Sequence, residues 1–564
     1  MPSRAGDSAY AKLQDRAASG PESLISRGGS PATVIHQDDK SQMTNQFGAL
    51  STASLVQYSS DRAIEALSPT RVKIRGSGQL CVILGTATLF VKRGTVSICG
   101  AILPASTRKV NIYSPRSHTL PAIDAIGGRA EIELESAELD LEGHGMQSLV
   151  AIGFPDVWRP LELDPTTYQR TFHIFGYHFM PDRSNAKRYT TLNTQDWNPV
   201  LTELAEHAKS TDRSTRILIH GPNNSGVSTF GQNLLNRLVN QADPAVGVAF
   251  VDLESERPGF TPPGTIALQQ VKIPVFGPPY TRPAANSGPL SKMHYVGIRG
   301  SKTSDVGWHY QCAIDLLDDE ARKGENQPLR PVIVHAPKWL SRLRAGSAEW
   351  IEIWDKINPT HVVSLGDSDT ASIPTDKIVY RMEAKRVEQY DMSRQADMSL
   401  QAYFHMVVSR EGERLFNCAP VVIDQLKTHA LRFDPYGIIK GVIIDDQSIA
   451  PEDVAAAVTG KIVAVLSVSS EALDQLGYTG NKASGRLYQF DGNLNTLPVP
   501  PAELCCIGFG FVRAVNESAK HLTLTTPIPA KMLNRTFSHE NKGNPQMILA
   551  VSNFSTDWLL NEVK

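Results

Sequence analysis

The chain of 564 residues has few cysteines, no strong excess of charge of either sign and no long hydrophobic run. Its six cysteines contain no C-x-x-C pair, so neither a disulfide framework nor a zinc site is indicated, and we expect a reducing compartment. The formal net charge of -2 means that any nucleic-acid binding must use a local patch. No apolar stretch is long enough to span a membrane and no secretory signal peptide is recognisable, so we expect an intracellular, soluble protein without a membrane partner.

The length predicts about three folded domains, and changes in composition suggest their boundaries. Residues 1–70 are rich in small and polar residues and predict a mostly disordered tail. Residues 71–195 contain short apolar runs separated by glycines, a pattern typical of a β-sandwich. Residues 196–405 alternate apolar strands with helical stripes and predict an α/β domain with a mainly parallel sheet. Residues 406–564 return to short β-like runs and predict a C-terminal β-rich domain.

The most informative motif is the loop Gly221–Thr229, which lies between a predicted strand and a predicted helix. Arg216–His220 is typical of a short buried strand, and apolar residues at helical spacing over 230–238 predict a helix that begins near Ser228. This arrangement directs backbone N–H groups at an anion. The loop matches the phosphate-binding pattern G-x-x-x-x-G-K-[ST], except that Val227 stands at the Lys position.

The loop therefore predicts a site for ATP and Mg²⁺ that lacks one positive charge. Backbone N–H groups between the two glycines would cradle the phosphates, and the Ser228 hydroxyl would bind Mg²⁺. A Lys would reach the β- and γ-phosphates, whereas Val227 cannot. The alternative is a glycine-rich turn that binds nothing. The predicted ATP-binding residues are Gly221, Ser225, Gly226, Val227, Ser228 and Thr229.

A second candidate feature is the acidic end of the predicted strand Val246–Asp252. In a phosphate-binding sheet an Asp at this edge can hold Mg²⁺ or orient a nucleophile, so Asp252 is a candidate for metal binding and for catalysis. The alternative is a solvated strand end. A rigid loop, Phe260–Gly264, follows the acidic residues, and two further strands are predicted at Pro331–His335 and His361–Val363.

These motifs resemble the eukaryotic polynucleotide 5′-hydroxyl kinases, which include a pre-ribosomal-RNA processing kinase and a relative in the pre-mRNA 3′-end cleavage machinery. The ribosomal branch is the more similar, and the resemblance covers about 75–564. It implies an α/β P-loop NTPase core with a parallel sheet, flanked by an N-terminal β-sandwich and a C-terminal β-rich domain. The segments that carry it are Asp252–Glu254, Phe260–Gly264, Pro337, Trp339, Gly460–Val465 and Cys506–Arg513.

The resemblance also implies an activity, a location and partners. Family members transfer the γ-phosphate of ATP to a 5′-hydroxyl, here an RNA 5′ end in pre-rRNA spacer processing, in the nucleus and nucleolus. The expected partner is a HEPN-type endoribonuclease or another subunit of an RNA-processing complex. By resemblance, Asp252 positions or deprotonates the 5′-hydroxyl, Arg394 reaches the phosphates from a lid helix, and Trp339 stacks on a terminal base. The alternative for Trp339 is a core aromatic.

Departures from the family pattern fall on the chemistry. Val227 replaces the Lys, Arg257 stands at a Gln position, the clasp T-P-G-W has become Ala336–Trp339, and Met398 stands about where another Arg is expected. Removing positive charge from a phosphoryl transition state costs several orders of magnitude in rate. Arg257 or Lys338 could return that charge. Two hypotheses therefore stay open: an ATP-dependent kinase, and a pseudokinase that persists as the scaffold of an RNA-processing endoribonuclease.

Overall fold

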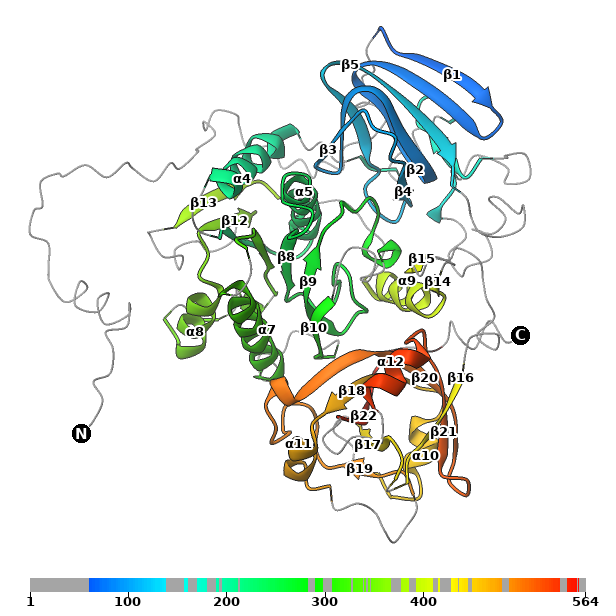
Figure 1. Cartoon of the computed structure of the whole chain (residues 1–564), viewed down its shortest axis with the longest axis vertical. Coiled ribbons are helices and arrows are strands. Elements are labelled where there is room, and N and C mark those ends of the chain that lie inside the picture. The colour runs from blue at the N-terminus through cyan, green and yellow to red at the C-terminus, as the bar shows by residue number, and fades with distance from the viewer. Residues whose placement is uncertain are drawn as a thin grey trace, which may run out of the picture. The chain divides into compact units, whose positions relative to one another are not determined.

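The structure is a computed structural model (Figure 1). It describes residues 60–137, 157–160, 170–179, 189–191, 195–210, 214–282, 290–297, 307–325, 328–337, 339–340, 343–344, 346–366, 377–384, 392–408, 414–415, 428–434, 436–444, 449–478, 486–537, 545–554 and 556. The predictions for residues 1–59 and for Lys338 lie outside these ranges. None of the helices found in the described ranges is both long enough and apolar enough to cross a membrane.

The N-terminal elements form a sheet of six described strands organised around one long strand, β2. Its members are β1 (Ala63–Ser68), β2 (Arg71–Ile98), β3 (Ala101–Pro104), β4 (Val110–Ser114), β5 (Ala122–Ser136) and β6 (Phe172–Ile174). Two arms of β2 pair with the two edges of β5, so that Ile132 lies opposite both Ile74 and Val91. Strand β1 lies inside the predicted disordered tail, which was wrong at these residues: antiparallel pairing with the start of β2 orders them.

The central sheet has the strand order β10-β9-β8-β11-β7-β12-β13. Its strands are β7 (Arg216–His220), β8 (Val248–Asp252), β9 (Thr265–Val271), β10 (Leu290–Tyr295), β11 (Val332–His335), β12 (His361–Leu365) and β13 (Ile378–Met382). Along this order the four pairings β8–β11, β11–β7, β7–β12 and β12–β13 are parallel, which confirms the predicted mainly parallel sheet. Strands β9 and β10 extend one edge in antiparallel fashion.

Helices cover both faces of this sheet, because successive residues of a strand point to opposite faces. Ile217 and Ile219 pack with the helices α4 (Asn198–Ser210) and α5 (Val227–Val239). Leu218 instead belongs to the cluster formed with α7 (Gly307–Glu325) and α8 (Ala348–Ile357). Helix α5, which lies against β8 in Figure 1, is the helix predicted to follow the glycine loop. Further along the chain comes α9 (Met392–Phe404).

The C-terminal part contains a second seven-stranded sheet, with the order β16-β21-β20-β18-β22-β17-β19 among the described residues. Its strands are β16 (Thr428–Arg432), β17 (Ile439–Ile443), β18 (Ile462–Val468), β19 (Gln489–Phe490), β20 (Leu504–Asn516), β21 (His521–Thr525) and β22 (Gln546–Val551). The short helices α10 (Val454–Val458), α11 (Ser470–Gln475) and α12 (Ala530–Thr536) accompany it, and β14 (Val407–Val408) pairs with β15 (Arg414–Leu415).

Candidate functional site

The glycine loop lies between β7 and α5, as the sequence predicts, and its two glycines are required by geometry. A Cβ on Gly221 would lie 2.5 Å from the carbonyl oxygen of Leu365, which is too close for any side chain. Gly226 has a φ of 100°, in the left-handed region that glycine adopts without strain. The loop therefore turns tightly enough to present the first N–H groups of α5, which have no partner within the helix.

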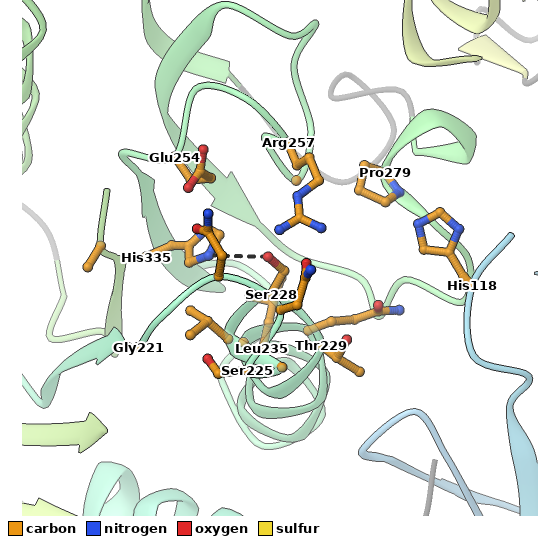
Figure 2. Close-up of a pocket in the computed structure, with 18 of the residues that line it drawn as sticks. His118, Gly221, Ser225, Ser228, Thr229, Leu235, Glu254, Arg257, Pro279 and His335 are labelled. Carbon is orange, nitrogen blue, oxygen red and sulfur yellow. Dashed lines mark hydrogen bonds between the residues drawn. The ribbon is translucent and has the colours of Figure 1, made fainter. Parts of the chain in front are cut away.

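A pocket opens above this loop. Every residue from Gly221 to Thr229 lines it, and other segments form its walls (Figure 2). Ser225 is 1% exposed, and its Oγ has no hydrogen-bond partner among the described residues. A buried hydroxyl without a partner is costly unless a ligand or water completes it. The walls include His118, Glu254, Arg257, Arg282 and His335.

Asp252 does not line this pocket, and its carboxylate is engaged in hydrogen bonds within the protein. Oδ1 accepts a hydrogen bond from Nδ1 of His335 at 2.8 Å and from the backbone N–H of Glu254 at 3.3 Å. Oδ2 accepts from the backbone N–H of Gly259 at 2.5 Å. Asp252 and His335 are 3% and 4% exposed, so the pair is buried.

His335 joins Asp252 to the glycine loop. Its Nε2 lies 3.4 Å from Oγ of Ser228 (Figure 2), while its other ring nitrogen, Nδ1, donates to Asp252. The strand order explains this position: β11 lies between β8 and β7, so its last residue lies between the ends of its two neighbours. Burial acts to lower the pKa of His335, but the carboxylates of Asp252 and Glu254 raise it by more, so the pKa is above the ordinary 6.5.

Two cationic side chains and a neutral histidine form the other walls of the pocket. Burial lowers the pKa of His118 to about 3, with the charges of Arg282 and Arg257 acting in the same direction. Burial also lowers the pKa of Arg282 to about 10, and its Nε donates to the carbonyl oxygen of Gly277 at 2.7 Å. Arg257 is partly exposed, and Figure 2 shows its guanidinium turned toward Ser228.

The structure does not bring the other two predicted residues into the pocket. Trp339 is 8% exposed and packs in the core, with its ring 5.4 Å from that of His309 and 6.0 Å from that of Tyr310. This is the placement of a core aromatic, and base stacking by Trp339 stays a prediction. Arg394 is exposed on α9 and its role also stays a prediction, although its neighbour Gln395 lines the pocket.

Among the pocket residues that sequence reasoning missed, three carry titratable side chains: His118, Arg282 and His335. His335 could have been suspected, because it ends a predicted strand and the carboxyl ends of parallel strands meet at one edge of the sheet. His118 and Arg282 come from segments that no periodicity connects to the loop. Their positions depend on tertiary structure alone.

The pocket fits bound phosphates better than it fits a Mg²⁺ ion held by both predicted metal ligands, Ser228 and Asp252. The glycine cradle, the unpartnered Ser225 hydroxyl and Arg257 suit a polyphosphate, and the Ser228 hydroxyl lines the pocket where a Mg²⁺ ligand is expected. Both carboxylate oxygens of Asp252 accept internal hydrogen bonds, and His335 lies between Asp252 and Ser228. Across the described residues, no group of three or more His, Cys, Asp or Glu side chains could hold a metal ion.

Comparison with known proteins gives a family match over the central domain. Residues 221–405 match the family model described as the mRNA cleavage and polyadenylation factor CLP1 P-loop. The chain is similar to polynucleotide 5′-hydroxyl-kinase grc3 of Aspergillus oryzae, with 26% identity over 525 residues that cover 79% of this chain and 62% of the relative. The protein of the same name from Aspergillus terreus is 27% identical over 544 residues, covering 80% and 64%.

A solved structure is similar at lower identity. A chain in the structure of the wild-type Clp1p–Pcf11p complex is 14% identical and has a TM-score of 0.48, with coverage of 86% of this chain and 98% of that one. The chain described here spans less than two thirds of the length of the two kinases from Aspergillus.

Proposed function

We propose that this chain, whose residues 221–405 match the CLP1 P-loop family model, binds ATP at its glycine loop and acts in RNA processing as a polynucleotide 5′-hydroxyl kinase. The observation that supports this most directly is the intact phosphate cradle. Gly221 and Gly226 permit the tight turn, and the buried Ser225 hydroxyl has no hydrogen-bond partner among the described residues. The similarity to polynucleotide 5′-hydroxyl kinases over 79–80% of the chain supports a polynucleotide 5′-hydroxyl as the acceptor, for which we propose an RNA 5′ end.

In the proposed reaction the γ-phosphate of ATP passes to the 5′-hydroxyl of the RNA. Bound Mg²⁺ would neutralise charge on the phosphates, with the Ser228 hydroxyl as its protein ligand. The loop N–H groups and Arg257 would orient the phosphates, which matters because positioning and charge stabilisation dominate this chemistry. Arg394 keeps its predicted catalytic role within this proposal, whereas a catalytic or metal-binding role of Asp252 would require its carboxylate to leave His335 and Gly259.

The proposal includes the setting predicted from the sequence. It places the protein in the nucleus and nucleolus, in pre-rRNA spacer processing, with a HEPN-type endoribonuclease or another RNA-processing subunit as its partner. It also includes the predicted domain division, with a β-sandwich over 71–195, the P-loop domain over 196–405 and a β-rich domain over 406–564.

A second candidate function is a non-catalytic scaffold of such a complex. Two observations favour it: Val227 removes the lysine from the loop, and the Asp252 carboxylate is occupied by His335 and Gly259. A scaffold would keep the fold and could keep ATP as a structural ligand, while turnover would be lost.

The test is transfer of radiolabelled γ-phosphate from ATP to a 5′-hydroxyl RNA oligonucleotide, with the protein alone and with co-purified partners. A matched DNA oligonucleotide measures substrate preference, and the Gly226→Asp variant gives the background of a closed cradle. Labelled RNA above that background supports the kinase. ATP binding without labelled RNA, in both preparations, supports the scaffold.

A further inference from the structure

The pocket has a cation that faces the glycine loop from outside it. Arg257 lines the same pocket as Ser225, Val227 and Ser228, and Figure 2 shows its guanidinium directed at Ser228 from the loop that follows β8. Val227 contributes only an apolar side chain, which packs partly against the core cluster of α4 and α5. The positive charge of this pocket therefore comes from a different segment than in the G-x-x-x-x-G-K-[ST] pattern.

The loop that carries Arg257 is held at both ends by one carboxylate. Oδ1 of Asp252 accepts the N–H of Glu254, three residues before Arg257, and Oδ2 accepts the N–H of Gly259, two residues after it. Phe260 then packs its ring 5.7 Å from that of Phe250. These contacts fix the backbone on either side of Arg257, so its side chain begins from a defined point above the pocket.

The electrostatics of the pocket agree with this geometry. The charge of Arg257 lowers the pKa of His118 on one wall and opposes the rise in the pKa of His335 on another. A charge felt by both walls is positioned to be felt by an anion between them. Glu254 also lines the pocket, but its Oε1 accepts the N–H of Glu256 at 2.9 Å, which turns one carboxylate oxygen back toward its own loop.

We propose that Arg257 is the phosphate-binding cation of this site in place of the missing lysine, and that Asp252 is a positioning residue that holds its loop. A guanidinium can bind phosphate oxygens through two parallel N–H bonds, which a lysine cannot do. The ligand class is a nucleoside triphosphate, or another polyphosphate of similar length. The proposal rests on the proposed function only for the presence of ATP in the pocket.

The experiment is a cation swap measured by calorimetric ATP binding. The variants are Arg257→Gln, Val227→Lys, the double variant and Arg257→Lys, with Arg322→Gln on α7 as a matched control outside the pocket. We expect Arg257→Gln to weaken ATP binding by about tenfold to a hundredfold, the range of one charge-assisted contact. Val227→Lys in that background should restore affinity to within a few fold of wild type, because the lysine stem can keep the packing of Val227.

A second cycle tests the positioning role of Asp252. Asp252→Ala should weaken ATP binding in the wild-type background and have little further effect when Arg257 is already Gln, because the two residues act through one contact. A purely structural role would weaken binding equally in both backgrounds and would overturn this part. Thermal melting of each variant identifies those that remain folded at the temperature of the titration.

The outcomes separate this proposal from the proposed function. If wild type binds ATP, Gly226→Asp does not, and Arg257→Gln binds as wild type does, the role of Arg257 is overturned while ATP binding stands. If wild type binds no ATP at millimolar concentration, ATP binding at this loop fails and the role of Arg257 fails with it. If Arg257→Gln is weak and Val227→Lys does not restore it, the replacement of the lysine is overturned.

Discussion

Two loops meet at the carboxyl edge of the central sheet, and they differ in how their polar groups are satisfied. The loop after β7 keeps the Ser225 hydroxyl buried without a described partner, facing the pocket. In the loop after β8, both oxygens of Asp252 are occupied by donors of the protein itself. The loop after β7, residues 221–229, has polar groups available for an anion, and we call it the open loop. In the loop after β8, residues 253–259, the Asp252 carboxylate stabilises the loop itself, and we call it the closed loop. Binding and structure are thus divided between neighbouring strand ends.

The largest expected effect is a loss of ATP affinity caused by a substitution in the open loop. Gly226→Asp should weaken ATP binding by more than about a hundredfold, because it places a carboxylate in an anion site and strains a left-handed residue. Calorimetry with ATP measures the loss. The matched control is Gly477→Asp, which adds the same side chain at a left-handed residue with a φ of 73° and nothing within 4 Å of the added Cβ, outside the pocket lining. Equal ATP binding by wild type and Gly226→Asp would show that the loop is not the binding site.

The next largest expected effect is a loss of stability caused by a substitution that removes the hydrogen bonds of the closed loop. Asp252→Ala leaves buried His335 and the N–H of Gly259 without their acceptor, so it should lower the free energy of unfolding by about 3 kcal/mol, as for other broken buried pairs. Chemical denaturation measures this loss. The ratio of ATP affinities with and without Mg²⁺ should not change, since the carboxylate is not aimed into the pocket. A lost Mg²⁺ dependence at unchanged stability would instead identify Asp252 as a metal ligand.

Two histidines sharpen the same comparison, because their pKa values shift in opposite directions. Burial lowers the pKa of His335, but the carboxylates of Asp252 and Glu254 raise it by more, whereas burial gives His118 on the pocket wall a pKa of about 3 in the folded protein. A histidine whose pKa is lowered by folding binds protons more readily when unfolded. His118 therefore costs stability as pH falls below 6.5, and the loss levels off near pH 3.

At pH 5 this cost is at most about 2 kcal/mol, from the difference between that pH and the ordinary pKa. His118→Gln should remove that part of the acid sensitivity, so the stability of the variant should fall less between pH 7 and pH 5. Denaturant titrations at both pH values give the difference, with His207→Gln on α4 as the control. An equal decline in wild type and His118→Gln would contradict the assignment.

The sequence predicts the open loop well and the closed loop poorly, for a physical reason. Arg216–His220 is an apolar run bounded by a glycine loop, and the structure has a strand with the same bounds. The helix was expected near Ser228 and begins at Val227. These features depend on local periodicity and turn chemistry, which a single sequence records.

The closed loop depends on contacts between distant residues. His335 is 83 positions from Asp252 and 107 from Ser228, and it joins them only because β11 is inserted between β8 and β7. The periodicity of apolar residues predicts where strands lie along the chain, but not their order within a sheet. The same limit applies to Trp339, whose aromatic clasp motif gave no indication that the ring packs beside His309 in the core.

The smallest expected effect is a gain in ATP affinity from a substitution that restores the missing lysine of the open loop. Val227→Lys restores the G-K-[ST] pattern, but if Arg257 already supplies the cation, the new charge enters a pocket that holds one. We therefore expect ATP binding to tighten by less than about tenfold, under 1.4 kcal/mol. Turnover should stay close to the wild-type rate, because the clasp at Ala336 is altered independently of the loop, and groups that act as one unit are strongly non-additive.

A larger rise in turnover would then need Arg257→Gln, Ala336→Thr and Lys338→Gly together with Val227→Lys. Single-turnover transfer of labelled phosphate to 5′-hydroxyl RNA, at saturating ATP, separates this chemical step from binding. A rise of several hundredfold with Val227→Lys alone would show that the lysine was the only defect and that Arg257 does not replace it. A wild-type rate already as high as that of Val227→Lys would show the opposite: the site is not degenerate, and its cation has moved to another segment.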